Sequence, residues 1–441
     1  MKTQLLRTIR VIVHADSDPV RQALFGHMRK HNTAVKFVWN THRIISGTYL
    51  SSALVFLFGV KSYASADVSS REQHLPLIVA IHKNAKNQGQ KIESWLAPQR
   101  VSWLKVSPAC LLNPRNFIRV VMGCFRIGAW LRFFPLVNRL NRRYDFLVSC
   151  RAASAIFSYV RAVEILEQQK PCGVIVSSDS NPEPLAFTRA ASAHGLPSIF
   201  MSHAYPTPVS PRLRFTLSIL EGEAALESYQ SKGPVQGDVM FCGAEGASKP
   251  IDAEKLTGEH PVIGIFASKV VCWPQFTGLI EDCRRQFNPK KILIRWHPNM
   301  LGRSELASKL TDLSAVVETD PTLPLQEVAQ RCDWVIADEN SNVNLGVLKA
   351  GIPILPMKEF SVLPESRADL YGFVENAVIP QPVKTVRGVS LEQLAEFYSK
   401  DWAERFGRYD ASYSQSAELL AEQARDAIQK VLSESPSRAE Q

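Results

Sequence analysis

Short apolar runs that alternate with helical segments limit this chain to a small set of folds. The clearest unit is "CGVIVSSDSNPEPLAFTRAASAHGLPSIFMSH", which begins at Cys172. Residues 173–177 form a continuous apolar run, which predicts a strand buried on both faces of a sheet. A helix is predicted over 183–194, ended by Gly195 and Pro197, and "SIFMSH" is the next strand. Strand, helix and strand joined by short links predict a right-handed crossover in a parallel sheet.

A second series of the same kind begins at "PVIGIFASK", after a polar and aperiodic stretch over 244–260. With 441 residues, the chain is also too long for one ordinary hydrophobic core. We therefore expect an α/β protein with two Rossmann-like, doubly wound domains that face a cleft, over 1–245 and 261–390, and a helical tail over 391–441. In such sheets ligands bind at the carboxyl ends of the strands, beside the point where the strand order reverses.

The stretch "ILIRWHPN" places a histidine where such a ligand would lie. Its apolar residues predict a strand, and His297 stands at the carboxyl end of that strand. Pro298 disfavours helical geometry at His297, so the backbone stays extended and the imidazole is presented at the sheet edge. A histidine can donate a hydrogen bond to a phosphate or carry charge towards it. A strand that simply ends in a turn is the other interpretation.

A second strand end follows in "DWVIADENSNVNLGVLKAGIPIL". A strand is predicted over 334–337, and Ser341 is a suitable N-cap for a helix that runs to Ala350. A helix N-terminus that carries the Ser341 hydroxyl and the Asn342 amide is a ready anion site. An ordinary capped helix of an α/β domain has the same pattern, so the motif gains weight only from the strand end at His297.

Together the two motifs resemble those of a known enzyme group. "IRWHPN" followed by "DENSNVNLGVLKAGIPIL" is similar to the HP and serine motifs of bacterial GT-B glycosyltransferases that build capsules, lipopolysaccharide and other surface polysaccharides. The group includes polysialyltransferase-like and Kdo-transferase-like enzymes and the related CDP-glycerol glycerophosphotransferases. The resemblance, which covers about 262–355, implies that His297, Pro298, Ser341 and Asn342 contact the phosphate of a nucleotide-activated donor.

The chain departs from this group at one position. Many GT-B enzymes carry a glutamate on the helix after the serine, where it grips the ribose or sugar of the donor, but residues 345–347 here read Leu-Gly-Val. The identity of the donor, a CMP-sugar or another nucleotide-sugar, therefore stays open. Ser268 and Lys269, after the first strand of the second domain, are either further phosphate contacts or a solvated loop end.

An inverting transferase needs a general base for the acceptor hydroxyl, and the first domain offers two candidates. Asp179 stands at a strand end in "SSDSNPEP", where it either faces the cleft or caps a turn. His203 ends the next strand and is the alternative base or an acceptor contact. Glu183 and Glu221 are weaker candidates.

The net charge of +9 is concentrated in one segment. Residues 100–143 carry nine basic residues and no acid, among many large apolar side chains; the basic residues are Arg100, Lys105, Arg115, Arg119, Arg126, Arg132, Arg139, Arg142 and Arg143. Arginine among apolar residues is typical of a helix in an anionic membrane interface, with Arg119, Arg126 and Arg132 as contacts. The alternative is a buried helix pair whose arginines reach solvent or acidic partners. No nucleic-acid motif accompanies the segment.

Neither a metal nor a cofactor is expected. The stretch "Asp16-Ser17-Asp18" mimics a metal-binding DxD motif, but we interpret it as a helix start before Pro19. The eight cysteines include no CxxC pair, which favours reduced thiols. With no convincing secretory signal, we expect a cytoplasmic protein held at the inner face of the cytoplasmic membrane.

The sequence therefore favours an inverting, metal-independent glycosyltransferase that moves a sugar from a nucleotide donor to a glycan or lipid-linked glycan acceptor. Three alternatives stay open: a polyol-phosphate transferase that uses CDP-glycerol or a relative, a sugar-nucleotide epimerase, and a non-catalytic protein that binds a nucleotide-sugar or glycan. An epimerase would require a cluster of acids in the cleft.

Overall fold

A computed structural model describes residues 2–18, 22, 40, 44–46, 48–70, 72–81, 83–106, 131–202, 204–244, 248–267, 273–297, 316–320, 322–358 and 369–434. Eight residues named above lie outside these ranges: Pro19, Arg115, Arg119, Arg126, His203, Ser268, Lys269 and Pro298.

The first domain is built on a seven-stranded sheet in the order β1-β3-β2-β4-β5-β6-β7. Its strands are β1 (Ala66–Val68), β2 (Leu77–Val79), β3 (Ser102–Val106), β4 (Val174–Val176), β5 (Ser198–Met201), β6 (Arg214–Leu220) and β7 (Gln236–Phe241). All pairings are parallel except that of β1 with β3. The chain runs outward from β2 to β3 and then crosses to β4, so the strand order reverses between β2 and β4.

Helices cover both faces of this sheet because its strands alternate their side chains between two cores. Leu77, Val79 and Val174 pack into the main core, under helices α9 (Phe146–Gln169) and α10 (Pro182–Ala193). Ile78 and Ile175 point the other way, into a second core under α5 (Lys83–Leu96) and α19 (Ala417–Ser433). The β2 and β4 strands are thus buried on both faces, as the apolar run over 173–177 predicted.

Helix α9 is the centre of the helical layer. It packs against α1 (Lys2–Asp16), α4 (Tyr49–Ser65), α8 (Phe134–Arg143) and α10. Among the described helices it is the one with the length and apolar composition of a membrane span, and 67% of the window concerned is buried in the protein. This burial is the environment of a core helix. Pro135 lies in the first turn of α8, where a proline starts a helix.

The second domain has a five-stranded parallel sheet in the order β10-β9-β8-β11-β12. Its strands are β8 (Val262–Phe266), β9 (Lys291–Arg295), β10 (Val316–Glu318), β11 (Trp334–Asp338) and β12 (Ile354–Met357). Its helices are the 3-10 turn η1 (Ala253–Thr257), α12 (Trp273–Phe287), α14 (Leu325–Ala329) and α15 (Val343–Lys349). The chain steps from β8 to β10 on one side and then crosses to β11, so the strand order reverses between β8 and β11.

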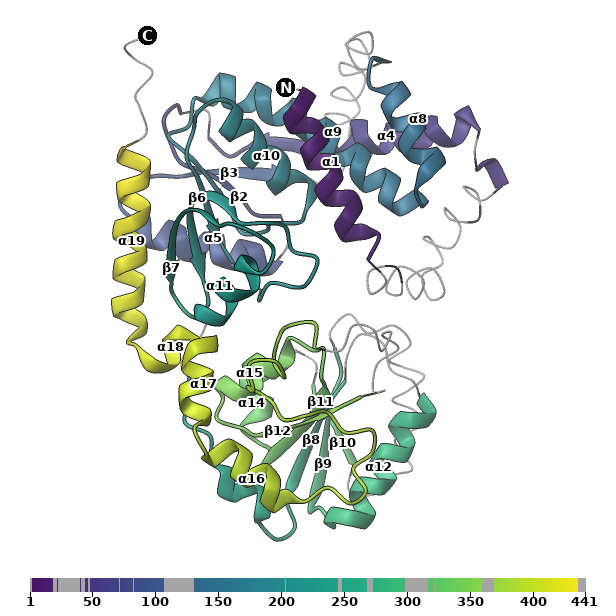
Figure 1. Cartoon of the computed structure of the whole chain (residues 1–441), viewed down its shortest axis with the longest axis vertical. Coiled ribbons are helices and arrows are strands. Elements are labelled where there is room, and N and C mark those ends of the chain that lie inside the picture. Colours follow the sequence, from purple (N-terminus) through teal and green to yellow (C-terminus); the bar gives the residue numbers. More distant parts are fainter. Residues whose placement is uncertain are drawn as a thin grey trace.

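The C-terminal tail binds first to the second domain and then to the first (Figure 1). Helices α16 (Leu391–Ser399) and α17 (Trp402–Tyr409) pack on the second domain, where the Tyr398 hydroxyl donates to the Ile354 carbonyl oxygen and the Trp402 indole donates to that of Val378. After α18 (Ala411–Ser414), α19 runs along the first domain and contacts β6 and β7. Two parallel-sheet domains joined by a returning C-terminal helix confirm the expected GT-B architecture.

A buried ion pair joins the three parts of the chain. The Lys349 ammonium group, at the end of α15, donates to Asp410 Oδ2 at 2.6 Å, to Ser412 Oγ at 2.9 Å and to the Ala244 carbonyl oxygen at 3.0 Å. Both charged side chains are buried. Asp410 Oδ1 in turn accepts from the Ala244 backbone N–H at 3.0 Å. The linker, the second domain and the tail therefore meet at one fully hydrogen-bonded charge pair.

Aromatic rings extend this junction to both domains. Tyr409 of the tail stacks on Tyr205 of the first domain, with ring centroids 4.4 Å apart, and on Phe373 of the second domain at 5.3 Å. The Tyr409 hydroxyl donates to the Tyr371 carbonyl oxygen at 3.0 Å. Gly222 lies directly against the tail, because a Cβ atom there would come within 2.5 Å of the Arg408 carbonyl oxygen.

We predict that Lys349→Met lowers the free energy of unfolding by about 3 to 5 kcal/mol, because it leaves the Asp410 carboxylate buried without a counter-charge. Urea denaturation followed by tryptophan fluorescence measures this change. Arg408→Met is the matched control, since Arg408 also joins the tail to the first domain but pairs with Glu227 in an exposed position. The control should lose about 1 kcal/mol at most, and an equal loss in the two variants would contradict the role of the buried pair.

Candidate functional site

The two donor-phosphate motifs lie at the same edge of the second sheet. His297 follows β9 and is half-buried, and Ser341 follows β11. Strand β8 separates them, so they stand two strand spacings apart, about 10 Å. This edge flanks the reversal of strand order between β8 and β11, the position at which open α/β sheets bind ligands.

The turn after β11 is fixed by its own hydrogen bonds. The backbone N–H of Ser341 donates to the Asp338 carbonyl oxygen at 3.0 Å, and that of Asn340 donates to Asp338 Oδ1 at 2.7 Å. Helix α15 begins only at Val343, with the exposed Asn342 as its cap residue. The prediction that Ser341 caps a helix to Ala350 was therefore wrong in its bounds.

This correction changes the source of the positive potential. Helix α15 has seven residues, and Asn342 makes no side-chain capping bond. The Ser341 hydroxyl accepts a long bond of 3.4 Å from the Val343 N–H. A helix this short offers little dipole to an anion, so α15 contributes little positive potential to this edge of the sheet.

Glu339 is an acid of this edge that the sequence analysis did not single out. Its side chain is buried, and its Oε2 atom has no hydrogen-bond partner in the described part of the chain. Burial raises the pKa of Glu339 to about 7, the neighbouring Asp338 raises it further, and Lys358 opposes the shift. The glutamate that many GT-B enzymes carry on the helix after the serine is absent from α15, but Glu339 lies two residues before Ser341. Its signal was the polar triplet "DEN" directly after a buried strand.

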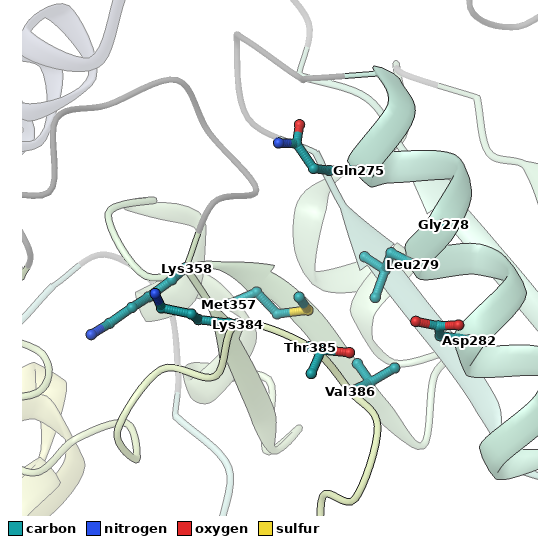
Figure 2. Close-up of a pocket in the computed structure, with 9 residues that line it drawn as sticks. All are labelled: Gln275, Gly278, Leu279, Asp282, Met357, Lys358, Lys384, Thr385 and Val386. Carbon is teal, nitrogen blue, oxygen red and sulfur yellow. The ribbon is translucent and has the colours of Figure 1, made fainter.

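Lys358 follows β12 and lies close enough to Glu339 to oppose the rise in its pKa. Lys358 follows Met357, and Figure 2 shows it next to Lys384 at one end of a cavity, with Asp282 of α12 towards the other end. The cavity encloses about 150 Å³. Pockets for whole small-molecule ligands usually enclose roughly 300–1,000 Å³. The described residues of this cavity thus surround a space smaller than a whole small-molecule ligand usually occupies.

On the first domain, Asp179 lies in the loop after β4 and is half-buried. The Tyr229 hydroxyl of helix α11 (Glu223–Gln230) donates to Asp179 Oδ2 at 2.7 Å. The Lys232 ammonium group lies 5.0 Å from the Tyr229 ring centroid and donates to the Thr207 carbonyl oxygen. Burial lowers the pKa of Lys232 to about 8, against the opposing effect of Asp179. Asp179 therefore stands at a strand end with a fixed orientation, as expected of either a base or a structural acid.

Glu221, a weaker candidate in the sequence, follows β6 at the same edge. It is buried, and burial raises its pKa to about 7; Asp410 and Asp179 raise it further, while hydrogen bonds, including one from Ser202, lower it. Its backbone carbonyl oxygen accepts from the Ala411 N–H of the tail at 2.9 Å. An acid with a pKa near neutrality can exchange protons at physiological pH. Glu221 contacts the tail, so its pKa depends on how the tail packs at the domain junction.

Residues 369–376 connect the two sheet edges. The Leu370 backbone N–H donates to Asn340 Oδ1 at 2.6 Å, beside Ser341. The Asn376 side-chain amide donates to the Tyr205 hydroxyl at 3.4 Å, in the segment that follows β5. Residues that follow β5 and β11 thus both contact one short segment.

The part of the basic segment that the structure describes lies beside exposed apolar residues. The Arg132 guanidinium is exposed and lies 4.9 Å from the Phe133 ring centroid. Large hydrophobic side chains are also exposed on α4 and at the start of the described range 131–202: Tyr49, Leu50, Leu57, Phe58 and Leu131. Arg142 lies over the Tyr49 ring and Lys61 over the Phe58 ring.

No metal-binding arrangement of three or more His, Cys, Asp or Glu side chains occurs within the described ranges. Asp16 ends α1 and forms a 2.6 Å ion pair with Arg151, which holds α1 on α9. Beyond α1, the Gln22 backbone N–H donates to the Asp18 carbonyl oxygen at 2.9 Å, the bond of a first helical turn, and Gln22 is helical, in agreement with the interpretation of "Asp16-Ser17-Asp18" as a helix start before Pro19. The buried carboxylate explains the motif structurally.

No protein-family model and no curated protein sequence matches the chain. Solved structures with a similar arrangement include the calicheamicin glycosyltransferase CalG4, at 11% identity and a TM-score of 0.49, covering 83% of this chain and 99% of that one. UDP-N-acetylglucosamine 2-epimerase from Rickettsia bellii has 12% identity and a TM-score of 0.48, covering 82% and 97%. MurG from Acinetobacter baumannii has 11% identity and a TM-score of 0.43, covering 81% and 99%. The likeness to these structures is one of chain arrangement and not of sequence.

We predict that Glu221→Gln removes a pH-dependent loss of stability. The folded carboxyl group keeps its proton up to about pH 7, whereas its ordinary pKa is 4.5. Between these values the folded state binds more protons than the unfolded state, so stability falls as pH rises. The variant should gain roughly 3 kcal/mol over the wild type between about pH 4.5 and about pH 8.

Urea denaturation across this pH range measures the difference, with the exposed Glu254→Gln as the control. Parallel pH profiles for the wild type and Glu221→Gln would show that this carboxyl group is not held protonated in the folded protein.

Proposed function

We propose that this protein is a nucleotide-sugar glycosyltransferase with its donor site on the second domain and its acceptor site on the first. The observation that supports this most is the placement of both sets of polar residues at opposed sheet edges, joined by residues 369–376. A transfer reaction requires two substrates to meet in one water-poor space. In the GT-B arrangement each domain supplies one of them.

The donor phosphate would lie between His297 and Ser341, with Lys358 as a third positive or donating group. As the bond between the sugar and the phosphate oxygen breaks, negative charge grows on that oxygen. Hydrogen bonds and charges aimed at it stabilise the transition state, which is usually the largest contribution to such reactions. Pro298 would keep the His297 backbone extended, and Asn342, Ser268 and Lys269 are proposed as further contacts.

Asp179 would act as the general base of an inverting transfer. It would take the proton of the acceptor hydroxyl while that oxygen attacks the anomeric carbon and the nucleotide leaves from the opposite face. The hydrogen bond from Tyr229 fixes the orientation of Asp179. Glu221 is too deeply buried to reach an acceptor directly, and His203 remains the alternative base.

A screen of CMP, CDP, UDP, GDP and ADP by thermal shift tests the donor site. We expect one cytidine or uridine nucleotide to raise the unfolding temperature, because a ligand stabilises the state to which it binds. His297→Ala should lose most of that shift. His194→Ala, at the C-cap of α10 in the first domain, is the control that should keep it. A wild type that responds to none of the nucleotides would refute the donor site.

The role of Asp179 is tested by separating catalysis from binding. Asp179→Asn should lower kcat by roughly 10²- to 10⁴-fold, the usual contribution of a general base. The nucleotide-induced thermal shift should stay at its wild-type size, because the donor site lies on the other domain. Full activity in Asp179→Asn, with activity lost in a His203 variant instead, would move the base to His203.

A sugar-nucleotide epimerase is a second candidate, and one observation favours it. Such an enzyme requires acids near the bound sugar, and Glu339, whose pKa burial raises to about 7, lies at the candidate donor edge. Incubation with a nucleotide-sugar in D₂O, without acceptor, separates the two functions. An epimerase exchanges a carbon-bound proton of the sugar, whereas a glycosyltransferase leaves it in place.

We further propose that the protein works at the cytoplasmic face of the bacterial inner membrane in capsule or lipopolysaccharide synthesis. The exposed apolar residues of α4 and the flanking Lys61, Arg132 and Arg142 have the composition of a protein surface that binds an anionic membrane. Arg119 and Arg126 belong to the same basic segment. Lipid-linked acceptors would be presented at this surface, with a CMP-sugar as one possible donor class.

Flotation with phosphatidylglycerol vesicles tests this location. Arg132→Glu/Arg142→Glu should abolish flotation at low salt, because each basic residue near an anionic surface contributes about 1 kcal/mol. Arg285→Glu/Arg425→Glu, with both changes at exposed positions of α12 and α19, should float as the wild type does. Equal flotation of both double variants would reject the membrane surface.

A further inference from the structure

A cluster of arginines lines a cavity of about 380 Å³ on the first domain, apart from both candidate substrate sites. The cavity lies between α1, α10 and the segment that leads into β6, and α1 and α10 pack against each other (Figure 1). Its basic residues are Arg7, Arg10, His14, Arg189, Arg212 and Arg214. The other described lining residues, Val11, Val209 and Pro211, are apolar, so no carboxylate of the described ranges lines the cavity.

We name this cavity the arginine pocket. Its arginines lack counter-charges within the described part of the chain. No ion pair is formed there by Arg7, Arg10, Arg189 or Arg214, whereas arginines elsewhere, such as Arg151, pair with acids. Arg212 donates to the Lys232 carbonyl oxygen, which fixes its position without neutralising its charge.

Arg189 is the member of the arginine pocket that bears most directly on a ligand. Its Nε atom is buried and has no hydrogen-bond acceptor in the described residues. Burial lowers the pKa of its guanidinium, and the charges of Arg214 and Arg7 lower it further. A buried donor without an acceptor destabilises a fold, and so do like charges at short range. Both costs vanish when an anion occupies the cavity.

We propose that the arginine pocket binds a phosphate group of a ligand other than the nucleotide donor. Guanidinium groups present rigid pairs of N–H donors that match phosphate oxygens, and they stay charged even when water is excluded. This binding would be separate from the glycosyltransferase function, because no residue of the arginine pocket belongs to the proposed donor or acceptor site. The phosphate belongs either to a soluble molecule or to a lipid headgroup, since the recognising chemistry is the same.

Two binding measurements on the full chain distinguish these sources. Isothermal calorimetry with inorganic pyrophosphate tests the soluble source, and flotation with phosphatidic acid vesicles against phosphatidylcholine vesicles tests the lipid source. The test variant is Arg10→Gln/Arg214→Gln, with the single Arg10→Gln on an exposed helix position as the version least able to disturb folding. The control is Arg285→Gln/Arg425→Gln, which removes the same charge elsewhere.

We expect pyrophosphate to bind the wild type and the control equally and the double variant at least about tenfold more weakly, the usual effect of losing a charge-assisted hydrogen bond. Flotation on phosphatidic acid that only the Arg10 and Arg214 variants lose would support the lipid source. Absence of both kinds of binding in the wild type, or binding that survives equally in the test variant, would overturn the proposal. The loss that is specific to the Arg10 and Arg214 variants separates this binding from any pyrophosphate held at the proposed donor site, which those variants leave intact.

Discussion

A lysine ammonium group and an aspartate carboxylate, both withdrawn from water, hold this molecule in one arrangement. Lys349 comes from the second domain and Asp410 from the tail, and the linker residue Ala244 hydrogen-bonds to both. A buried pair contributes little net stability compared with apolar residues of the same shape. It is intolerant of misalignment, however, since any shift leaves a charge unpaired, so the pair specifies how the domains meet.

The position of the candidate site follows from that junction. The tail passes between the domains there, and its Tyr409 stacks on Tyr205 at one sheet edge and on Phe373 beside the other. The same packing excludes water from Glu221, which raises its pKa. The raised pKa of Glu221 and the fixed domain arrangement thus have a common cause, namely burial under the tail.

Local patterns in the sequence were sufficient to predict most of the fold. Apolar runs such as those of β4 and β11 identify strands because a parallel sheet buries both of their faces, and Gly195 and Pro197 identify a helix end. The register of short elements was less predictable, as the late start of α15 after Ser341 shows. Hydrogen bonds that Asp338 accepts from Asn340 and Ser341 fix that turn, and a one-dimensional pattern does not specify their geometry.

The site was predictable only in part, for a related physical reason. His297 and Ser341 could be placed at strand ends because strand ends are local features. Lys358 and the Lys349–Asp410 pair depend on contacts between residues far apart in the chain, as does the arginine pocket, which joins α1 to α10 and β6. An alternation of apolar and polar residues carries no information about which distant side chains share a space.

The central claim is that a phosphate of a nucleotide-activated donor binds at the carboxyl edge of the second sheet, opposite Asp179. A crystal structure of the protein with a nucleoside diphosphate tests it most directly. The account predicts electron density for a phosphate within hydrogen-bond distance of His297 and Ser341, beside the ends of β8 and β11. Density for the nucleotide elsewhere, with that edge empty, would contradict it.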